Sequence, residues 1–154
     1  MNISILLPFK ENYTHKNAGA VSLFVNDITN ESAYKKTIMI YGSTEYKKYL
    51  SSNYKNIKFN KNLLQSSNYQ YVSNFINFDK ALNSDLIEVH NRPKYIIQIR
   101  EKFFKKLFLY FHNDPLTMNG SKTVLDRIHL LNSVDKLIFN SKWCRDRFFI
   151  DLKN

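Results

Sequence analysis

Two histidines stand where apolar runs give way to polar residues in the second half of the chain. His90 follows the run 85–88 and His112 follows the run 107–110, and both runs are typical of buried strands. In an open α/β sheet, ligands bind at the carboxyl edge of the strands. We therefore predict that both imidazoles lie at a binding edge, where they could bind or polarise a substrate hydroxyl or act as acid or base near neutral pH. The polar residues that follow them are further candidates: Asn91, Arg92, Asn113 and Asp114.

Plainer roles compete at these positions. A histidine at a strand end can simply hydrogen-bond its own loop. Asp114 could orient His112 or a ligand hydroxyl, but an aspartate before a proline is also common at turns. The other two histidines, His15 and His129, are weaker candidates, and His129 falls within a predicted helix.

Two predicted helix starts offer unpaired N–H groups that could hold an anion. Gly19 and Ala20 precede a helix, and a small residue there lets a ligand approach the backbone closely, although a tight turn would also need glycine. Ser141 begins the last predicted helix, where Lys142 or Arg145 could help hold a phosphate. A capped amphipathic helix explains the same three residues equally well.

The sequence lacks the motifs of several enzyme classes. Residues 120–123 resemble a phosphate-binding P-loop only faintly, and there is no H-E-x-x-H, Asp-X-Asp or G-x-S-x-G motif. The single cysteine, Cys144, excludes an intramolecular disulfide and a cysteine-based zinc site, and it fits a reducing cytoplasm. We therefore expect no metal and no cofactor, and hydrolase or metal-dependent chemistry lacks its residues.

Length and net charge limit the number of domains and the kinds of partner that the protein could bind. The 154 residues predict a single domain, 1–154, and the net charge of +10 would suit nucleic acid, an anionic membrane surface or a phosphorylated small molecule. Abundant Lys, Asn, Ile, Tyr and Phe are also typical of an AT-rich coding sequence, which explains part of the charge without function. The first eight residues lack the features of a signal peptide or membrane span. We expect a cytoplasmic protein, soluble or held peripherally at the inner face of a membrane.

Strand and helix signals alternate along the chain. The predicted strands are 3–7, 37–41, 57–59, the two runs that lead to His90 and His112, and 136–139. The predicted helices are one carrying Val21, Phe24, Val25 and Ile28, one over 45–50, one over 69–82, one beginning at Pro93, one carrying Val124, Leu125, Ile128 and Leu131, and one after Ser141. Six such β/α units predict an α/β fold with a mostly parallel sheet and helices on both faces. The pattern does not specify the strand order.

The order of four segments resembles the N-terminal domain of family 4 glycosyltransferases of the GT-B fold. The segments are 18–21, 85–93, 108–115 and 134–143, and together they span nearly the whole chain. The resemblance implies a Rossmann-like three-layer sandwich with about six strands. It also implies a retaining, metal-independent hexosyltransferase that moves a sugar from a nucleotide-sugar donor to a glycan or lipid-linked acceptor, as in polysaccharide or lipopolysaccharide biosynthesis.

The same resemblance assigns roles to particular residues. His112 matches the catalytic-site histidine that contacts the transferred sugar, and Gly19 matches the loop that approaches the donor diphosphate. Residues 90–92 and Ser141 match segments that line the interdomain cleft. Ala20 stands where many relatives have a second glycine.

In that family a second Rossmann-like domain carries the nucleotide pocket and neutralises the departing diphosphate. Because that charge must be stabilised for the bond to break, we expect residues 1–154 alone to be inactive and to need this half in cis or in trans. Two alternatives stay open. One is a non-catalytic partner subunit of a membrane glycosyltransferase, with an exposed apolar or basic face. The other is a basic nucleic-acid-binding module, although the cations are scattered along the sequence.

Overall fold

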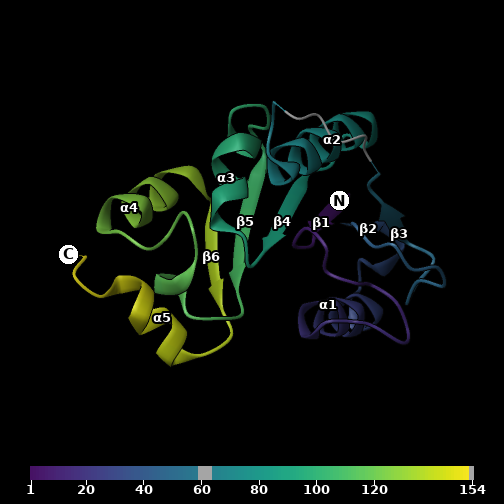
Figure 1. Cartoon of the computed structure of the whole chain (residues 1–154), viewed down its shortest axis with the longest axis horizontal. Helices are drawn as coiled ribbons and strands as arrows, with labels where there is room; N and C mark the ends of the chain where they lie inside the picture. Colours follow the sequence, from purple (N-terminus) through teal and green to yellow (C-terminus); the bar gives the residue numbers. More distant parts are fainter. Residues whose placement is uncertain (59–63, 153–154) are drawn as a thin grey trace. The chain divides into compact units, whose positions relative to one another are not determined.

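The computed structural model describes residues 1–58 and 64–152. Its centre is a sheet of six parallel strands in the order β3-β2-β1-β4-β5-β6, flanked by helices (Figure 1). The strands are β1 (Ile3–Leu6), β2 (Ile38–Gly42), β3 (Tyr54–Asn56), β4 (Leu86–His90), β5 (Lys106–Phe111) and β6 (Lys136–Phe139). The helices are α1 (Ala20–Glu31), α2 (Ser67–Leu82), α3 (Pro93–Arg100), α4 (Val124–Ser133) and α5 (Lys142–Phe149), with short 3-10 turns η1 (Lys35–Thr37) and η2 (Pro115–Thr117). The predicted Rossmann-like α/β fold is confirmed.

The chain forms two compact units, residues 1–87 and 88–154. In the first unit, β1, β2 and β3 pair in parallel register, with Ile3 opposite Ile38 and Ile40 opposite Tyr54. Helices α1 and α2 lie on opposite sides of these strands in Figure 1. Apolar side chains from all these layers, such as Val25 and Phe75, are fully buried. The unit therefore has its own core.

In the second unit, β5 and β6 pair in parallel and set Phe111 opposite Phe139. Helix α3 packs on β5 and on α4, while α5 packs on β6 and η2. Pro93 is the first residue of α3, as predicted, because proline there gives up an N–H that has no partner within the helix. Thr123 begins α4 with a reciprocal capping box to Asp126.

The predicted helix over 45–50 is wrong, because these residues form an irregular segment. The Asn56 side chain accepts from the Thr44 N–H and donates to the Thr44 carbonyl, both at 2.9 Å. Lys48 adopts a left-handed φ of 66°, and Tyr49 forms an isolated antiparallel bridge with Thr14. These partners hold the backbone out of a helical path. The third strand also begins earlier than predicted, at Tyr54 instead of residue 57, and Phe59 lies outside the described residues.

The four apolar residues whose spacing predicted α4 face solvent. They are Val124, Leu125, Ile128 and Leu131. The buried residues of α4 are Arg127 and Leu130, because the Arg127 guanidinium donates inward to the carbonyls of Lys122 at 3.1 Å and Ile150 at 2.7 Å. Ile28 on α1 and Ile97 on α3 are exposed as well. Helical spacing thus predicted α4 but did not show which of its residues are buried.

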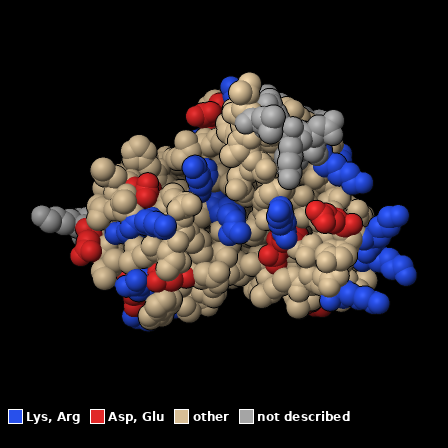
Figure 2. Space-filling model, in the orientation of Figure 1, with Lys and Arg blue, Asp and Glu red and all other residues tan. Residues whose placement is uncertain are grey.

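The positive charge on the face drawn in Figure 2 is not gathered in one place. Lysine and arginine side chains on this face are interspersed with acidic and uncharged residues. Scattered cations raise the overall attraction to anions without marking a track for a long polyanion. None of the described helices is long and apolar enough to cross a membrane.

Candidate functional site

The two strand-end histidines lie side by side in the second unit. His90 ends β4, His112 directly follows β5, and the arrowheads of these neighbouring strands point the same way in Figure 1. His90 Nδ1 and His112 Nε2 are 2.8 Å apart, and the two rings stack with their centroids 5.1 Å apart. The structure therefore brings together the two histidines that the sequence singled out, at the carboxyl edge of the sheet.

Glu88 fixes the proton positions of both rings. Its Oε1 lies 2.7 Å from His90 Nε2, and because a carboxylate only accepts, Nε2 carries the proton of His90. The Nδ1 of a neutral His90 is then an acceptor, so the Nε2–H of His112 donates to it. Glu88, His90 and His112 thus form one hydrogen-bonded chain, called here the Glu88 relay. Sequence analysis missed Glu88, although two residues apart on a strand point to the same face.

Burial keeps His112 neutral. His90 is fully buried, His112 is half-buried, and the Tyr110 ring stacks on His112 with centroids 4.5 Å apart. Burial, followed by the proximity of His90, lowers the pKa of His112 from 6.5 to about 4, although Glu88 acts in the opposite direction. A neutral imidazole at physiological pH favours hydrogen bonding over the proton transfer that the sequence also allowed.

Asn91 holds the loop between the two histidines. It is buried, with a left-handed φ of 55°, a conformation that asparagine tolerates better than most residues. Its Oδ1 accepts from the His112 N–H at 3.2 Å, and its own N–H donates to the Tyr110 carbonyl at 2.8 Å. Arg92 donates to the Asn91 carbonyl at 2.8 Å, and Asn140, which follows β6, donates to the His112 carbonyl at 2.7 Å. These contacts position His112, and Asn140 was not predicted.

Asp114 bonds to groups other than the His112 ring, which was one of the partners that the sequence allowed for it. It accepts from the Leu116 N–H at 3.0 Å and pairs with Arg147 of α5 at 3.0 Å. Burial opposes ionisation of Asp114, but the hydrogen bonds from Arg147 and Leu116 outweigh it and lower the pKa of this carboxyl. The exposed Asn113 offers its carbonyl to the thiol of Cys144 at 3.3 Å. Glu88, acting through His90, is the carboxylate that orients His112.

The predicted anion site at the start of α5 is a capped helix terminus in this structure. The Ser141 hydroxyl accepts from the Cys144 N–H at 3.1 Å. Lys142 is exposed and pairs with Asp146 one turn along the helix. Arg145 lines a groove beside β6. The three predicted side chains therefore do not converge on one point.

Gly19 and Ala20 lie at the start of α1 in the first unit, as predicted. Gly19 is the N-cap, and the Glu11 carboxylate occupies the space that a side chain at Gly19 would take. Glu11 Oε1 also accepts from the Ser22 N–H at 3.3 Å. An anion thus sits at this helix terminus, and it belongs to the protein itself. Sequence analysis missed Glu11 because nothing local ties it to residues 19–22.

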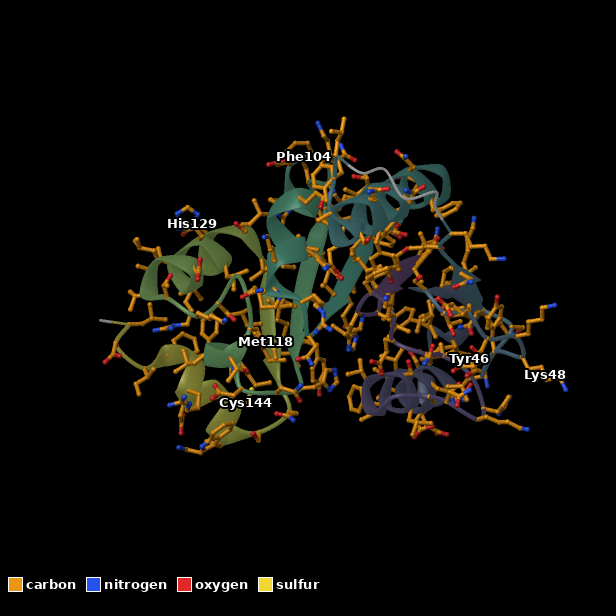
Figure 3. The ribbon with its side chains drawn as sticks, viewed as in Figure 1. Tyr46, Lys48, Phe104, Met118, His129 and Cys144 are labelled. Atoms are coloured by element: carbon orange, nitrogen blue, oxygen red, sulfur yellow. The ribbon has the colours of Figure 1, made fainter. Side chains whose placement is uncertain are left out.

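The weaker candidates contribute little. His15 and His129 are exposed, and Figure 3 shows His129 on the outside of α4. Among residues 1–58 and 64–152, no three His, Cys, Asp or Glu side chains are grouped to hold a metal ion.

Comparison with known proteins supports the fold. No protein-family model matches the sequence, and no curated protein sequence matches it. The structure is similar to that of sucrose-phosphate synthase from Thermosynechococcus elongatus, with a TM-score of 0.61 and 12% sequence identity. The similarity covers 99% of this chain and 45% of that one, so this chain spans less than half the length of the synthase. At this identity the likeness shows a GT-B-like fold and does not single out family 4.

Proposed function

We propose that this chain is the acceptor-side half of a nucleotide-sugar-dependent glycosyltransferase. The observation that carries the proposal is the Glu88 relay, which ends in His112 beside the carboxyl edge of a parallel sheet. Ligands of open α/β sheets bind at that edge. The GT-B-like fold supports sugar transfer as the class of reaction.

In this proposal His112 contacts the transferred sugar. The relay fixes the tautomer and the orientation of its ring, and its low pKa keeps it uncharged near neutral pH. A neutral, oriented imidazole discriminates between sugar hydroxyls by hydrogen bonding without adding a charge to the site. In the segment 90–92, His90 and Asn91 are buried and position His112, so Arg92 is the partly exposed residue that meets a ligand at this edge.

The finer features of the reaction belong to the proposal as well. We infer retaining, metal-independent transfer to a glycan or lipid-linked acceptor of cell-surface polysaccharide or lipopolysaccharide, at the cytoplasmic side of a membrane. The charge on the departing nucleotide diphosphate must be stabilised. A nucleotide-binding half, in cis or in trans, supplies that stabilisation, so residues 1–154 alone do not turn over.

Ligand-observed saturation-transfer NMR tests this function with UDP-glucose, UDP-N-acetylglucosamine and GDP-mannose. We expect saturation to pass from the protein to the sugar ring of at least one of these donors. This transfer should be lost in His112→Ala and kept in His129→Ala, since His129 is an exposed histidine on α4. Equal saturation in both variants, or none in the wild type, contradicts a sugar contact at His112. Turnover of a donor by the isolated polypeptide contradicts the need for a second half.

A partner subunit is the second candidate function. The exposed apolar stripe of α4 (Val124, Leu125, Ile128 and Leu131) favours it, because contiguous apolar surface often marks a protein interface. Such a subunit would bind its catalytic half and no sugar nucleotide, so the same NMR experiment separates the two functions. Co-sedimentation with anionic liposomes at low and physiological salt tests peripheral membrane binding, and absence of binding at both removes it. On the face drawn in Figure 2 the cations are interspersed with acidic and uncharged residues, which disfavours a nucleic-acid-binding surface there.

A further inference from the structure

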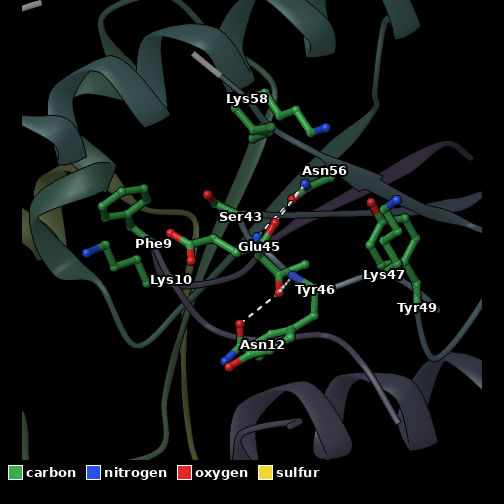
Figure 4. Close-up of a pocket in the computed structure, with 12 residues that line it drawn as sticks. Phe9, Lys10, Asn12, Ser43, Glu45, Tyr46, Lys47, Tyr49, Asn56 and Lys58 are labelled. Carbon is green, nitrogen blue, oxygen red and sulfur yellow. Dashed lines mark hydrogen bonds between the residues drawn. The ribbon is translucent and has the colours of Figure 1, made fainter. Parts of the chain in front are cut away.

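A pocket of about 1010 Å³ lies in the first unit, apart from all residues singled out by the sequence. It is lined by the segments that follow β1, β2 and β3, including Phe9, Lys10, Asn12, Glu45, Tyr46 and Lys58 (Figure 4). Small-molecule sites occupy roughly 300–1,000 Å³. This pocket is therefore large enough for more than one sugar ring, and it opens at the edge where α/β proteins bind ligands.

The walls of the pocket are tied together by side-chain hydrogen bonds. Thr44 is bonded to Asn56 through both its N–H and its carbonyl, and the Thr44 hydroxyl donates to Asn12 Oδ1 at 2.8 Å. These bonds join the segments after β1 and β2 to the last residue of β3, and Figure 4 draws them as dashed lines. A site held in place before the ligand arrives loses less free energy on binding.

The charge of the lining favours an anion. Lys10, Lys47 and Lys58 line the pocket with a single carboxylate, Glu45. Within the described part of the chain, none of these lysines forms an ion pair, and Lys10 only lies over the Phe9 ring at 5.7 Å. Ammonium groups without a protein carboxylate are ready to bind phosphate or carboxylate.

The backbone of Lys10 adds a second observation. Its φ of 64° lies in the left-handed region, where glycine or asparagine would be less strained. Strained residues of this kind cluster at ligand sites. Lys48 shares the conformation, with a φ of 66°, but does not line the pocket, so it is a matched comparison.

The remaining lining residues suit a sugar ring. Phe9, Tyr46 and Tyr49 offer apolar faces for the C–H groups of a pyranose, and Asn12, whose Oδ1 accepts from Thr44, offers amide N–H groups for its hydroxyls. Aromatic faces, an amide and cations together recognise a saccharide that carries an acidic group.

We propose that this pocket binds an acidic saccharide, phosphorylated or carboxylated, as the acceptor. The assignment as acceptor rests on the proposed function, whereas binding itself does not. Two sources share this chemistry, a sugar phosphate and a uronic-acid glycan. The test therefore has an arm for each.

Protein-observed ¹H–¹⁵N NMR on the full chain tests the proposal with glucose 6-phosphate, trigalacturonate, maltotriose and inorganic phosphate. We expect one of the two acidic saccharides to shift resonances of residues 9–12 and 43–49, and to bind at least tenfold more tightly than maltotriose or phosphate alone. Equal binding of inorganic phosphate overturns saccharide recognition, and equal binding of maltotriose overturns the acidic requirement. Absence of binding by both acidic probes overturns the site.

Matched variants locate the binding. Lys10→Asn should lower the affinity about 5–10-fold, as expected for loss of one charge-assisted contact, while Lys48→Asn should leave it unchanged. Both variants replace lysine at a left-handed position by a residue that tolerates it, so both should keep or raise the melting temperature. Equal affinity of the two variants contradicts the site. This experiment follows the resonances of residues 9–12 and 43–49, whereas the saturation-transfer experiment depends on His112. Absence of acidic-saccharide binding is therefore distinguishable from absence of a sugar contact at His112.

Discussion

Replacing Glu88 with glutamine tests how the relay fixes the two histidines. The Glu88 side chain is 15% exposed and its partner His90 is 0% exposed, so solvent screens their 2.7 Å hydrogen bond only weakly. A hydrogen bond to a charged group contributes ~1.5–3 kcal/mol, and a neutral amide in its place ~1 kcal/mol. Glu88→Gln should therefore lower the free energy of unfolding by ~1–2 kcal/mol. The exposed Glu101, changed to glutamine, is the control and should alter it by less than ~0.5 kcal/mol.

Long-range ¹H–¹⁵N correlation spectra of the imidazoles give the more specific readout. In the wild type both rings should carry their proton on Nε2, because Glu88 can only accept from His90. A glutamine can also donate, which allows the opposite tautomer of His90 and His112. Because the Glu88 charge raises the pKa of His112, its removal should lower that pKa further. A wild-type His90 protonated on Nδ1, or a Gln variant with unchanged spectra and stability, would refute the relay.

Three further changes test other parts of the structure. His112 has a lower pKa folded than unfolded, so the unfolded state binds more protons between pH 6.5 and about 4. The free energy of unfolding, measured by urea denaturation, should therefore fall by at most ~3 kcal/mol as the pH is lowered from 6.5 to about 4. In His112→Gln this dependence on pH should be weaker, and the same dependence in variant and wild type contradicts the prediction. Arg127→Ala should cost ~3 kcal/mol in thermal unfolding, because it leaves a cavity and removes the partner of the Ile150 carbonyl; a loss under ~1 kcal/mol contradicts the buried role. Glu11→Gln should lower the free energy of unfolding by ~0.3–1 kcal/mol, because it removes a negative charge from the N-terminus of α1. Glu31→Gln, at the C-terminus of α1, should not lower it, and equal effects of the two changes in urea denaturation contradict a stabilising role of Glu11.

The fold was predictable because its signals are local. Apolar runs between polar segments marked every strand except β3, and the run before His112 became β5 with little change in its bounds. The same locality placed His90 and His112 at strand ends. Their contact followed from β4 and β5 being neighbours, which the sequence pattern alone did not specify.

The errors come from contacts between residues distant in sequence. The irregular path of 45–50 depends on Asn56 bonding to Thr44, and the inward turn of α4 depends on Arg127 reaching Ile150, 23 residues away. Helical spacing carries no information about such partners, so it predicts α4 without showing that its apolar residues are exposed. Glu88 is a different case, because residues two apart on a strand lie on the same face. Its spacing from His90 alone therefore predicts that the two side chains are neighbours.

A crystal structure with a bound nucleotide sugar would show whether His112 contacts a sugar. We expect a sugar hydroxyl within about 3 Å of a ring nitrogen of His112, with the Glu88 relay unchanged behind it. A nucleotide sugar bound elsewhere on the chain, with His112 contacting protein groups only, would contradict it.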